Sequence, residues 1–233
     1  MKKFGLIGGI GPESTTKYYQ LIIQRYRKRL NTEAYPDFLI RSIDMTAMLS
    51  FVFEKDLEGL TNFLLQHLDE LERSGVVCSA MASNTPHIVF DQLRDRTGLQ
   101  LISIVEETCK TIKSQALQTV GLFGTRSTME AGFYQANAEK HGFKIVIPND
   151  EEMAFIHAKY FEELVFNQIN PDTKTELLAI ADALQAKNGI EGLILGGTEL
   201  SLILDQSDFK ELKLFDTTLI HVDSIVSEMI SYA

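Results

Sequence analysis

The sequence predicts an α/β protein with two similar lobes, each built on a mainly parallel sheet flanked by helices. The first observation behind this prediction is that short apolar runs alternate with longer segments of helical period. The second is a repeat. The strand pattern around Gly5 returns at Gly121, 116 positions later, and the strand ending at Ser83 returns at Gly197, 114 positions later. Both offsets are about half of the 233 residues, which favours a repeated lobe over chance recurrence of strand–glycine endings.

Each element of the first half is predicted from a simple pattern. Pro12 suits the first position of a helix that runs to about Leu30. A second helix begins near Leu57, because apolar residues recur from there to Leu71 at spacings of three and four, and Gly75 ends it. Short apolar runs predict the strands, at 4–7, 37–43, 76–81 and 101–104.

The second half repeats this order of elements. Its first strand is expected at 119–125 and a later one at 192–198. Between them, Asn170 followed by Pro171 is typical of a capped helix start, and Gly189 is typical of the end of that helix. The same alternation of strand and helix in both halves supports the two-lobe prediction.

Composition restricts the function. There are 22 Lys and Arg against 32 Asp and Glu, a net charge of −10, and the pI is near 5.0, which argues against nucleic acid or an anionic membrane as a partner. No run approaches the roughly 20 apolar residues of a membrane span. Two cysteines cannot form a disulfide framework, so we expect a reducing, cytoplasmic location. Cys78 in a strand and Cys109 on a helix are expected to be buried, and no His/Cys spacing predicts a metal site.

Ligand sites of parallel sheets lie at the carboxyl ends of the strands, so the loops that follow the strands are the candidate site. We expect the two lobes to face each other across a cleft, with one site built from both. The loops that would line it are residues 8–9, 83–85, 124–125 and 197–199.

The first of these loops, at Gly8 and Gly9, follows a strand and opens a helix. Its glycines let backbone N–H groups approach an anion at the helix N-terminus. A carboxylate fits better than a pyrophosphate, because Ser14 stands where a dinucleotide fingerprint needs glycine and Pro12 removes one donor. The alternative is a tight turn without a ligand.

The second loop places Ser83, Asn84 and Thr85 where a buried strand ends. Asn84 and Thr85 carry groups that bind a carboxylate or an ammonium group, and the alternative is that they cap a helix. His87 lies in the first turn after Pro86, either as a functional group or as a buried histidine with all its hydrogen bonds made.

The loops of the second half carry similar chemistry. Glu199 is able to receive an ammonium group or act as a base, or else favours the dipole of the helix that follows it. Asp216 ends a strand, where capping is the simpler role, and His221 lies one turn into the next helix. Thr125 to Thr128 supply hydroxyls and one cation, Arg126, at a helix start.

At these loops the sequence resembles the aspartate/glutamate racemase family, cofactor-independent racemases of the Asp/Glu/hydantoin racemase superfamily. The resemblance extends through essentially the whole chain, and the order of its motifs makes it specific. The segments that carry it are 5–15, 83–87, 124–130, 133–134, 161–164, 196–200 and 215–221.

The resemblance implies two pseudo-symmetric Rossmann-like lobes with the active site in the cleft between them. The last helix then returns to the first lobe, so we expect residues 1–100 plus 212–233 in one lobe and 101–211 in the other. It also implies a homodimer that uses no cofactor or metal and takes a small acidic amino acid or a dicarboxylate. Members of the family move the α-proton between two cysteines, one in a C-N-T motif and one in a G-C-T-E motif.

At both of these motifs the sequence departs from the family, with Ser83 and Gly197 at the cysteine positions. A serine hydroxyl is a much weaker acid than a thiol, and glycine has no side chain. The remaining acid–base candidates are Ser83 assisted by His87, with Glu199 or His221 opposite. The residues expected to bind the substrate are Gly8, Gly9, Asn84, Thr85, Thr125, Ser127, Thr128 and Thr198.

Two functions follow from this departure. One is a racemase-like enzyme with atypical or weak α-proton exchange. The other is a binding protein for an amino acid or dicarboxylate that keeps the fold without the catalysis. The sequence also leaves open whether Ser83 or Gly197 is natural or was engineered.

Overall fold

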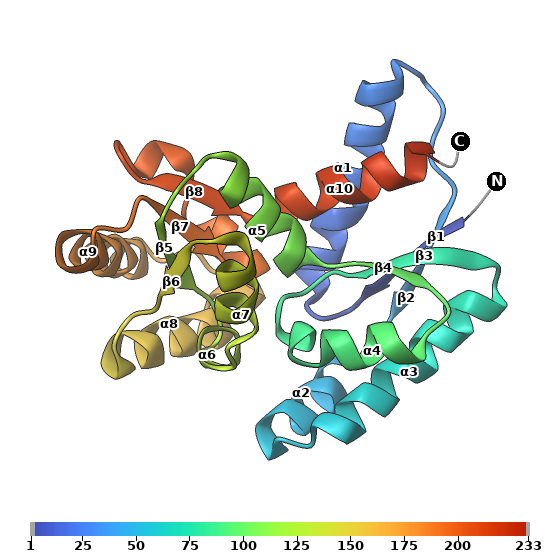
Figure 1. Ribbon diagram of the computed structural model, residues 1–233, viewed down its shortest axis with the longest axis horizontal. Helices are drawn as coiled ribbons and strands as arrows, with labels where there is room; N and C mark the ends of the chain where they lie inside the picture. The colour runs from blue at the N-terminus through green and yellow to red at the C-terminus, as the bar shows by residue number, and fades with distance from the viewer. Residues whose placement is uncertain (1–2, 232–233) are drawn as a thin grey trace. The chain divides into compact units, whose positions relative to one another are not determined.

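The computed structural model describes residues 3–231 and confirms the predicted fold class (Figure 1). The chain divides into two compact units. Unit 1 comprises the residues up to Ile104 and from Thr218 onward, and unit 2 comprises Val105–Thr217. Each unit contains one four-stranded sheet in which every strand pair is parallel. No helix within the described residues is both long and apolar enough to cross a membrane.

The sheet of unit 1 has the strand order β2-β1-β3-β4. Its central strand β1 pairs Leu6 with Ile40 of β2 and with Ala80 of β3. The strand expected at 101–104 ends earlier, at Ile102, because Ile104 already begins α5, and an apolar run does not mark where a buried strand gives way to a helix. The strands are β1 (Lys3–Gly8), β2 (Phe38–Ser42), β3 (Val76–Met81) and β4 (Gln100–Ile102). The helices are α1 (Pro12–Leu30), α2 (Met45–Glu54), α3 (Leu57–Arg73), the 3₁₀ helix η1 (Thr85–Val89), α4 (Phe90–Arg96) and α10 (Thr217–Ser231).

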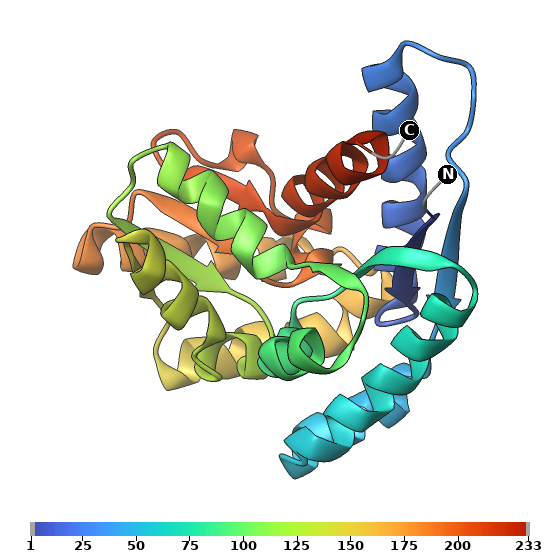
Figure 2. The same cartoon turned by 45° about the vertical axis from the view of Figure 1, so that its right-hand side comes forward.

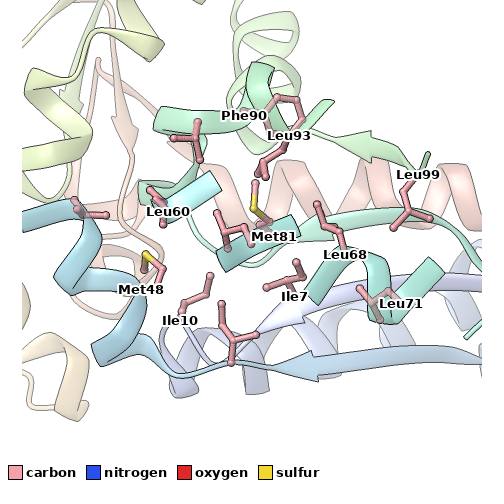
Figure 3. Packing of buried hydrophobic residues seen from close by; sticks show 14 of the residues in the cluster. Ile7, Ile10, Met48, Leu60, Leu68, Leu71, Met81, Phe90, Leu93 and Leu99 are labelled. Atoms are coloured by element: carbon pink, nitrogen blue, oxygen red, sulfur yellow. The ribbon is translucent and has the colours of Figure 1, made fainter. Parts of the chain in front are cut away.

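Helices cover both faces of this sheet. Helices α1 and α10 lie next to each other (Figures 1 and 2). Leu6 of β1 packs in a cluster with residues of both helices, which also share the ion pair between Arg29 and Asp223. Ile7, the next residue of β1, belongs to the cluster on the opposite face, which Figure 3 shows. The buried residues that α3 contributes to that cluster are Leu60, Leu64, Leu68 and Leu71.

Helix α3 forms where the leucine periodicity predicts it. The Asp56 side chain caps its N-terminus by accepting a hydrogen bond of 2.8 Å from Gly59 N–H. The helix ends at Arg73, and Gly75 follows with a left-handed φ of 83°, a conformation that glycine adopts without steric cost. The predicted end of the helix is therefore confirmed to within two residues.

The sheet of unit 2 has the order β6-β5-β7-β8. Its predicted helix from Pro171 is confirmed: the Asn170 side chain accepts a hydrogen bond from Asp172 N–H, and Gly189 ends the helix with φ 64°. The strands are β5 (Thr119–Phe123), β6 (Lys144–Val146), β7 (Gly192–Leu195) and β8 (Lys213–Asp216). The helices are α5 (Ile104–Ser114), α6 (Arg126–Glu130), α7 (Phe133–His141), α8 (Asp150–Glu162), η2 (Leu164–Phe166), α9 (Pro171–Asn188), η3 (Thr198–Leu202) and η4 (Gln206–Asp208).

The two sheets share one topology, in which the strand that comes first along the chain (β1 or β5) pairs with both the second and the third. The correspondence extends to the strand ends. In unit 1, Ala82 N–H donates to Ile7 O over 2.8 Å, and in unit 2, Gly196 N–H donates to Phe123 O over 2.7 Å. These paired positions are separated by the offsets found in the sequence, so the structure confirms a repeated α/β unit.

Candidate functional site

In unit 1, the expected ligand-binding loops lie side by side because β1 and β3 are neighbouring strands. Gly8 ends β1 and Gly9 follows it, while Ser83 follows the end of β3. Ser83 is half-buried, and Asn84 and Thr85 are buried. The structure therefore brings the predicted residues of the first half together at one edge of the sheet.

The loop at Gly9 is a tight turn held by Thr15. Gly9 N–H donates to Thr15 Oγ1 over 2.8 Å, and that hydroxyl donates to Gly11 O over 2.9 Å. Gly9 has φ 84°, and a Cβ on Gly8 would lie 2.5 Å from Thr15 Cγ2. Since Thr15 already uses the Gly9 N–H group, this geometry supports the turn over the anion site.

His87 is a buried residue of η1. Its Nε2 accepts a hydrogen bond of 3.3 Å from Ile104 N–H, so the neutral ring carries its hydrogen on Nδ1. Burial lowers the pKa of His87 to about 3, with a further contribution from nearby His221, while the backbone carbonyls of Ser83 and Asn84 act in the opposite direction. A neutral ring with its lone pair engaged is poorly suited to activate Ser83.

His221 is fully buried on α10. Its Nε2 lies 3.0 Å from Ile102 O, which only accepts hydrogen bonds, so Nε2 is the donor. Its Nδ1 lies 2.8 Å from Tyr18 Oη. His87 and His221 thus bind the backbone on either side of Ser103, where the chain leaves unit 1, and this geometry favours a structural role for both.

In unit 2, the hydroxyls expected to bind a ligand cap a short helix. Thr125 Oγ1 accepts a hydrogen bond from Thr128 N–H and lies 3.0 Å from Thr128 Oγ1. Ser127 is half-buried in the same five-residue helix. Arg126 N–H donates to His157 Nδ1 over 3.2 Å, and its guanidinium group pairs with Glu130.

The end of β7 carries a buried polar cluster formed by Gly197, Thr198, Glu199 and Tyr160 of α8. Oε2 of Glu199 accepts hydrogen bonds from the Tyr160 hydroxyl and, over 2.8 Å, from Thr198 Oγ1. Burial and the neighbouring Glu199 raise the pKa of Tyr160 well above its ordinary value, so the phenol is the donor. The Tyr160 ring also fills the space beside Gly197.

Both cysteines are buried and free, as predicted. Cys78 lies inside β3 and Cys109 inside α5, both unexposed. Burial raises the pKa of each thiol to about 12, so neither supplies a thiolate near neutral pH. Among residues 3–231, no three His, Cys, Asp or Glu side chains are grouped to hold a metal ion.

Sequence reasoning missed Tyr160 and Tyr18, although both bind predicted site residues. Each lies within a helix, where an aromatic residue is ordinarily part of the apolar face. Their polar contacts join residues 39 and 203 positions apart, Tyr160 to Glu199 and Tyr18 to His221. No local pattern carries that information.

Comparison with known proteins assigns the chain to a family. It belongs to the Asp/Glu/Hydantoin racemases, whose family model matches residues 7–225. It is 25% identical over 238 residues to the broad specificity amino-acid racemase RacX of Bacillus subtilis strain 168, covering 98% of both chains. The predicted family resemblance is therefore confirmed.

Solved structures agree with this assignment. A putative Asp/Glu racemase from Yersinia pestis has a TM-score of 0.90 and 31% identity, covering 99% of this chain and 100% of that one. An aspartate racemase homologue from Pyrococcus horikoshii OT3 has a TM-score of 0.85 and 35% identity with the same coverage. An aspartate racemase from Picrophilus torridus shares the fold at 20% identity, covering 98% of this chain and 94% of its own, with a TM-score of 0.73.

Proposed function

We propose that this chain binds a small acidic amino acid at its strand ends without thiol-based racemisation. The observation that carries the proposal is the chemistry of the two equivalent strand ends. Ser83 follows β3, Gly197 follows β7, and the Tyr160 ring occupies the space beside Gly197. A cofactor-independent racemase needs an acid–base group on each face of the α-carbon, and the buried thiols of Cys78 and Cys109 do not supply one.

The ligand class is supported by the relatives and by the polar groups at the strand ends. The curated relative is an amino-acid racemase, and a glutamate racemase from Francisella tularensis with this fold was solved in complex with D-glutamate. In this chain, Asn84 and Thr85 supply donors and acceptors for a carboxylate, and Glu199 supplies an acceptor for an ammonium group. A dicarboxylate without an ammonium group is the alternative ligand.

A second function is slow α-proton exchange, which the position of Glu199 favours. Its carboxyl group lies two residues after Gly197 and is held by two hydroxyl donors, an arrangement able to fix a base in one orientation. One base acting alone returns the proton to the face from which it came. Exchange without inversion is therefore the form of activity that the site supports.

One pair of measurements on the full chain tests these functions. Calorimetric titration with L-aspartate, L-glutamate and succinate measures binding, and proton NMR in deuterium oxide measures loss of the α-proton signal. We expect saturable binding of an amino acid with exchange no faster than in buffer. Exchange above buffer with retained configuration would establish the second function, and rapid racemisation or the absence of binding would contradict the proposal.

The resemblance also supports a homodimer in the cytoplasm. Two free, buried cysteines agree with a reducing compartment. Sedimentation velocity at micromolar concentration tests the dimer, since a single monomeric boundary would contradict it.

A further inference from the structure

Gly197 is a glycine for a steric reason. Its backbone is extended, with φ −131° and ψ 123°, a conformation that any residue adopts. A Cβ at this position, however, would lie 2.5 Å from Cε2 of Tyr160 and 3.2 Å from Cδ2. Contacts this short do not occur in packed proteins, so a side chain at 197 requires the Tyr160 ring to move.

Burial and two contacts oppose such a movement of Tyr160. Its side chain is 8% exposed, so its neighbours enclose the ring. Its hydroxyl donates to Glu199 Oε2, and its ring packs edge-on against Phe161 with centroids 5.4 Å apart. Rotating the ring away from Gly197 would break the hydrogen bond to Glu199 and leave a buried carboxyl oxygen with one donor fewer.

The equivalent strand end of unit 1 shows no such block, because Ser83 carries its side chain there in a half-buried position. The two strand ends therefore share a backbone hydrogen bond to the neighbouring strand but differ in the space available for a side chain. The residue that limits the space for a side chain at position 197 therefore lies outside the strand-end loop, in α8.

We propose that Tyr160 is a positioning residue that takes the space of the absent side chain at position 197 and holds Glu199 in its place. Positions 160 and 197 then act as a pair: a thiol fits at the end of β7 only when residue 160 is small. The steric part of this inference is independent of the proposed function, and only its catalytic consequence rests on it.

A stability cycle tests the steric pair. Gly197→Ala is compared in three backgrounds: the native chain, Tyr160→Ala and Tyr160→Phe. In the native chain we expect the alanine to lower the thermal midpoint by roughly 4–8 °C through overpacking. With Tyr160→Ala the same substitution should cost less than about 2 °C, while Tyr160→Phe, which keeps the ring, should retain the full cost. Equal costs in all three backgrounds would overturn the pair.

If Gly197→Ala does not fold, the test is whether a second substitution at position 160 restores folding. Folding of Gly197→Ala/Tyr160→Ala, with failure of Gly197→Ala/Tyr160→Phe, supports the ring as the obstacle. Failure of both double variants, when Tyr160→Ala itself folds, would overturn the inference. Circular dichroism and soluble yield suffice for this comparison.

Thiol labelling then reports on the site rather than on stability. Cys78 and Cys109 are buried, so iodoacetamide should react with the folded Gly197→Cys variant at the new thiol. The labelling rate therefore measures how accessible position 197 is. We expect the labelling rate to rise at least tenfold when Tyr160→Ala is added and to stay low with Tyr160→Phe. Similar rates in the two backgrounds would contradict the inference.

The catalytic consequence is tested in a chain carrying Ser83→Cys and Gly197→Cys. We expect α-proton exchange of L-aspartate above buffer when Tyr160→Ala is added, and none with Tyr160→Phe. If the stability cycle and labelling behave as expected but exchange stays absent, the steric pair stands and the proposed function of these strand ends is wrong. Exchange that is equal in both backgrounds would overturn the positioning role.

Discussion

At the scale of single residues, His87 shows how burial changes what a histidine does. Both its ring and its partner, Ile104 N–H, are buried, and its pKa falls to about 3. An imidazole that stays neutral down to this pH holds backbone in place but takes up no proton near neutrality. A histidine in this loop suggests a catalytic role, whereas the buried surroundings of His87 favour a structural role.

His87 should make the protein less stable as the pH falls from 6.5 towards 3. In this range the unfolded chain binds a proton at His87 that the folded chain excludes, so stability decreases by about 1.4 kcal/mol per pH unit. His87→Gln, which keeps an acceptor near Ile104 and does not titrate, should remove this loss. Urea unfolding at pH 7.5 and 5.0 measures it, and a pH dependence identical to that of the native chain would contradict it.

The hydrogen bond between Tyr18 and His221 should contribute to stability. Tyr18→Phe removes the hydroxyl that faces His221 Nδ1 at 2.8 Å in a fully buried setting, so we expect a loss of about 1–2 kcal/mol. The control is Tyr19→Phe, since the neighbouring Tyr19 is 49% exposed and its variant should lose less than about 0.5 kcal/mol. Equal losses in the two variants, measured by urea unfolding, would show that the hydrogen bond is not responsible.

The sequence identifies residues at strand ends more readily than residues that reach them from elsewhere. Ser83 and Gly197 were found because strand endings recur in the chain and parallel strands end at one edge. Tyr160 was not found, because its contact with Gly197 depends on how α8 packs against the end of β7. Which of two roles a polar residue takes, as for Thr125, also depends on partners fixed by the tertiary structure.

At the scale of elements, a helix can be predicted from the sequence when its apolar residues recur at a regular helical spacing. Helix α3 buries leucines at regular spacing, so both its presence and its end follow from the sequence. Helix α8 buries only Met153, Ile156 and Tyr160, and α6 is five residues long, so neither gives a clear periodic signal. Packing against the sheet stabilises such elements more than their own sequence does.

The apolar stripe of α3 should dominate the stability of this side of unit 1. Leu64→Ala removes a fully buried side chain from the apolar cluster that α3 shares with Ile7 of β1 and should cost about 2–5 kcal/mol. Leu57 lies at the start of the same helix but is 38% exposed, so Leu57→Ala should cost less than about 1 kcal/mol. Chemical denaturation of both variants checks the difference, and equal costs would refute the assigned burial.

At the scale of the whole molecule, the sequence predicts the repeat of two similar units, but it does not predict which unit the last helix joins. Two offsets of similar size predict two units of one topology, and the strand orders agree. The return of α10 to unit 1 came from the family resemblance, because no local pattern states which sheet a final helix covers. The residues of α10 in the unit 1 core are Val222, Ile225 and Val226.

Unit 1 is assembled from both ends of the chain. A destabilising substitution in the last helix, α10, should therefore lower the stability of strands β1 and β3 of unit 1. Ile225 is fully buried in the cluster that also contains Phe4 and Leu6 of β1, so Ile225→Ala should cost about 2–4 kcal/mol. Amide hydrogen exchange should then quicken in β1 and β3 more than in β5 and β7, whose unit does not include α10 beyond its first residue. The control is Ser231→Ala at an exposed position of the same helix, which should leave exchange unchanged. Equal acceleration in the strands of both units would mean that the chain opens as one cooperative body, which contradicts an independent core in unit 1.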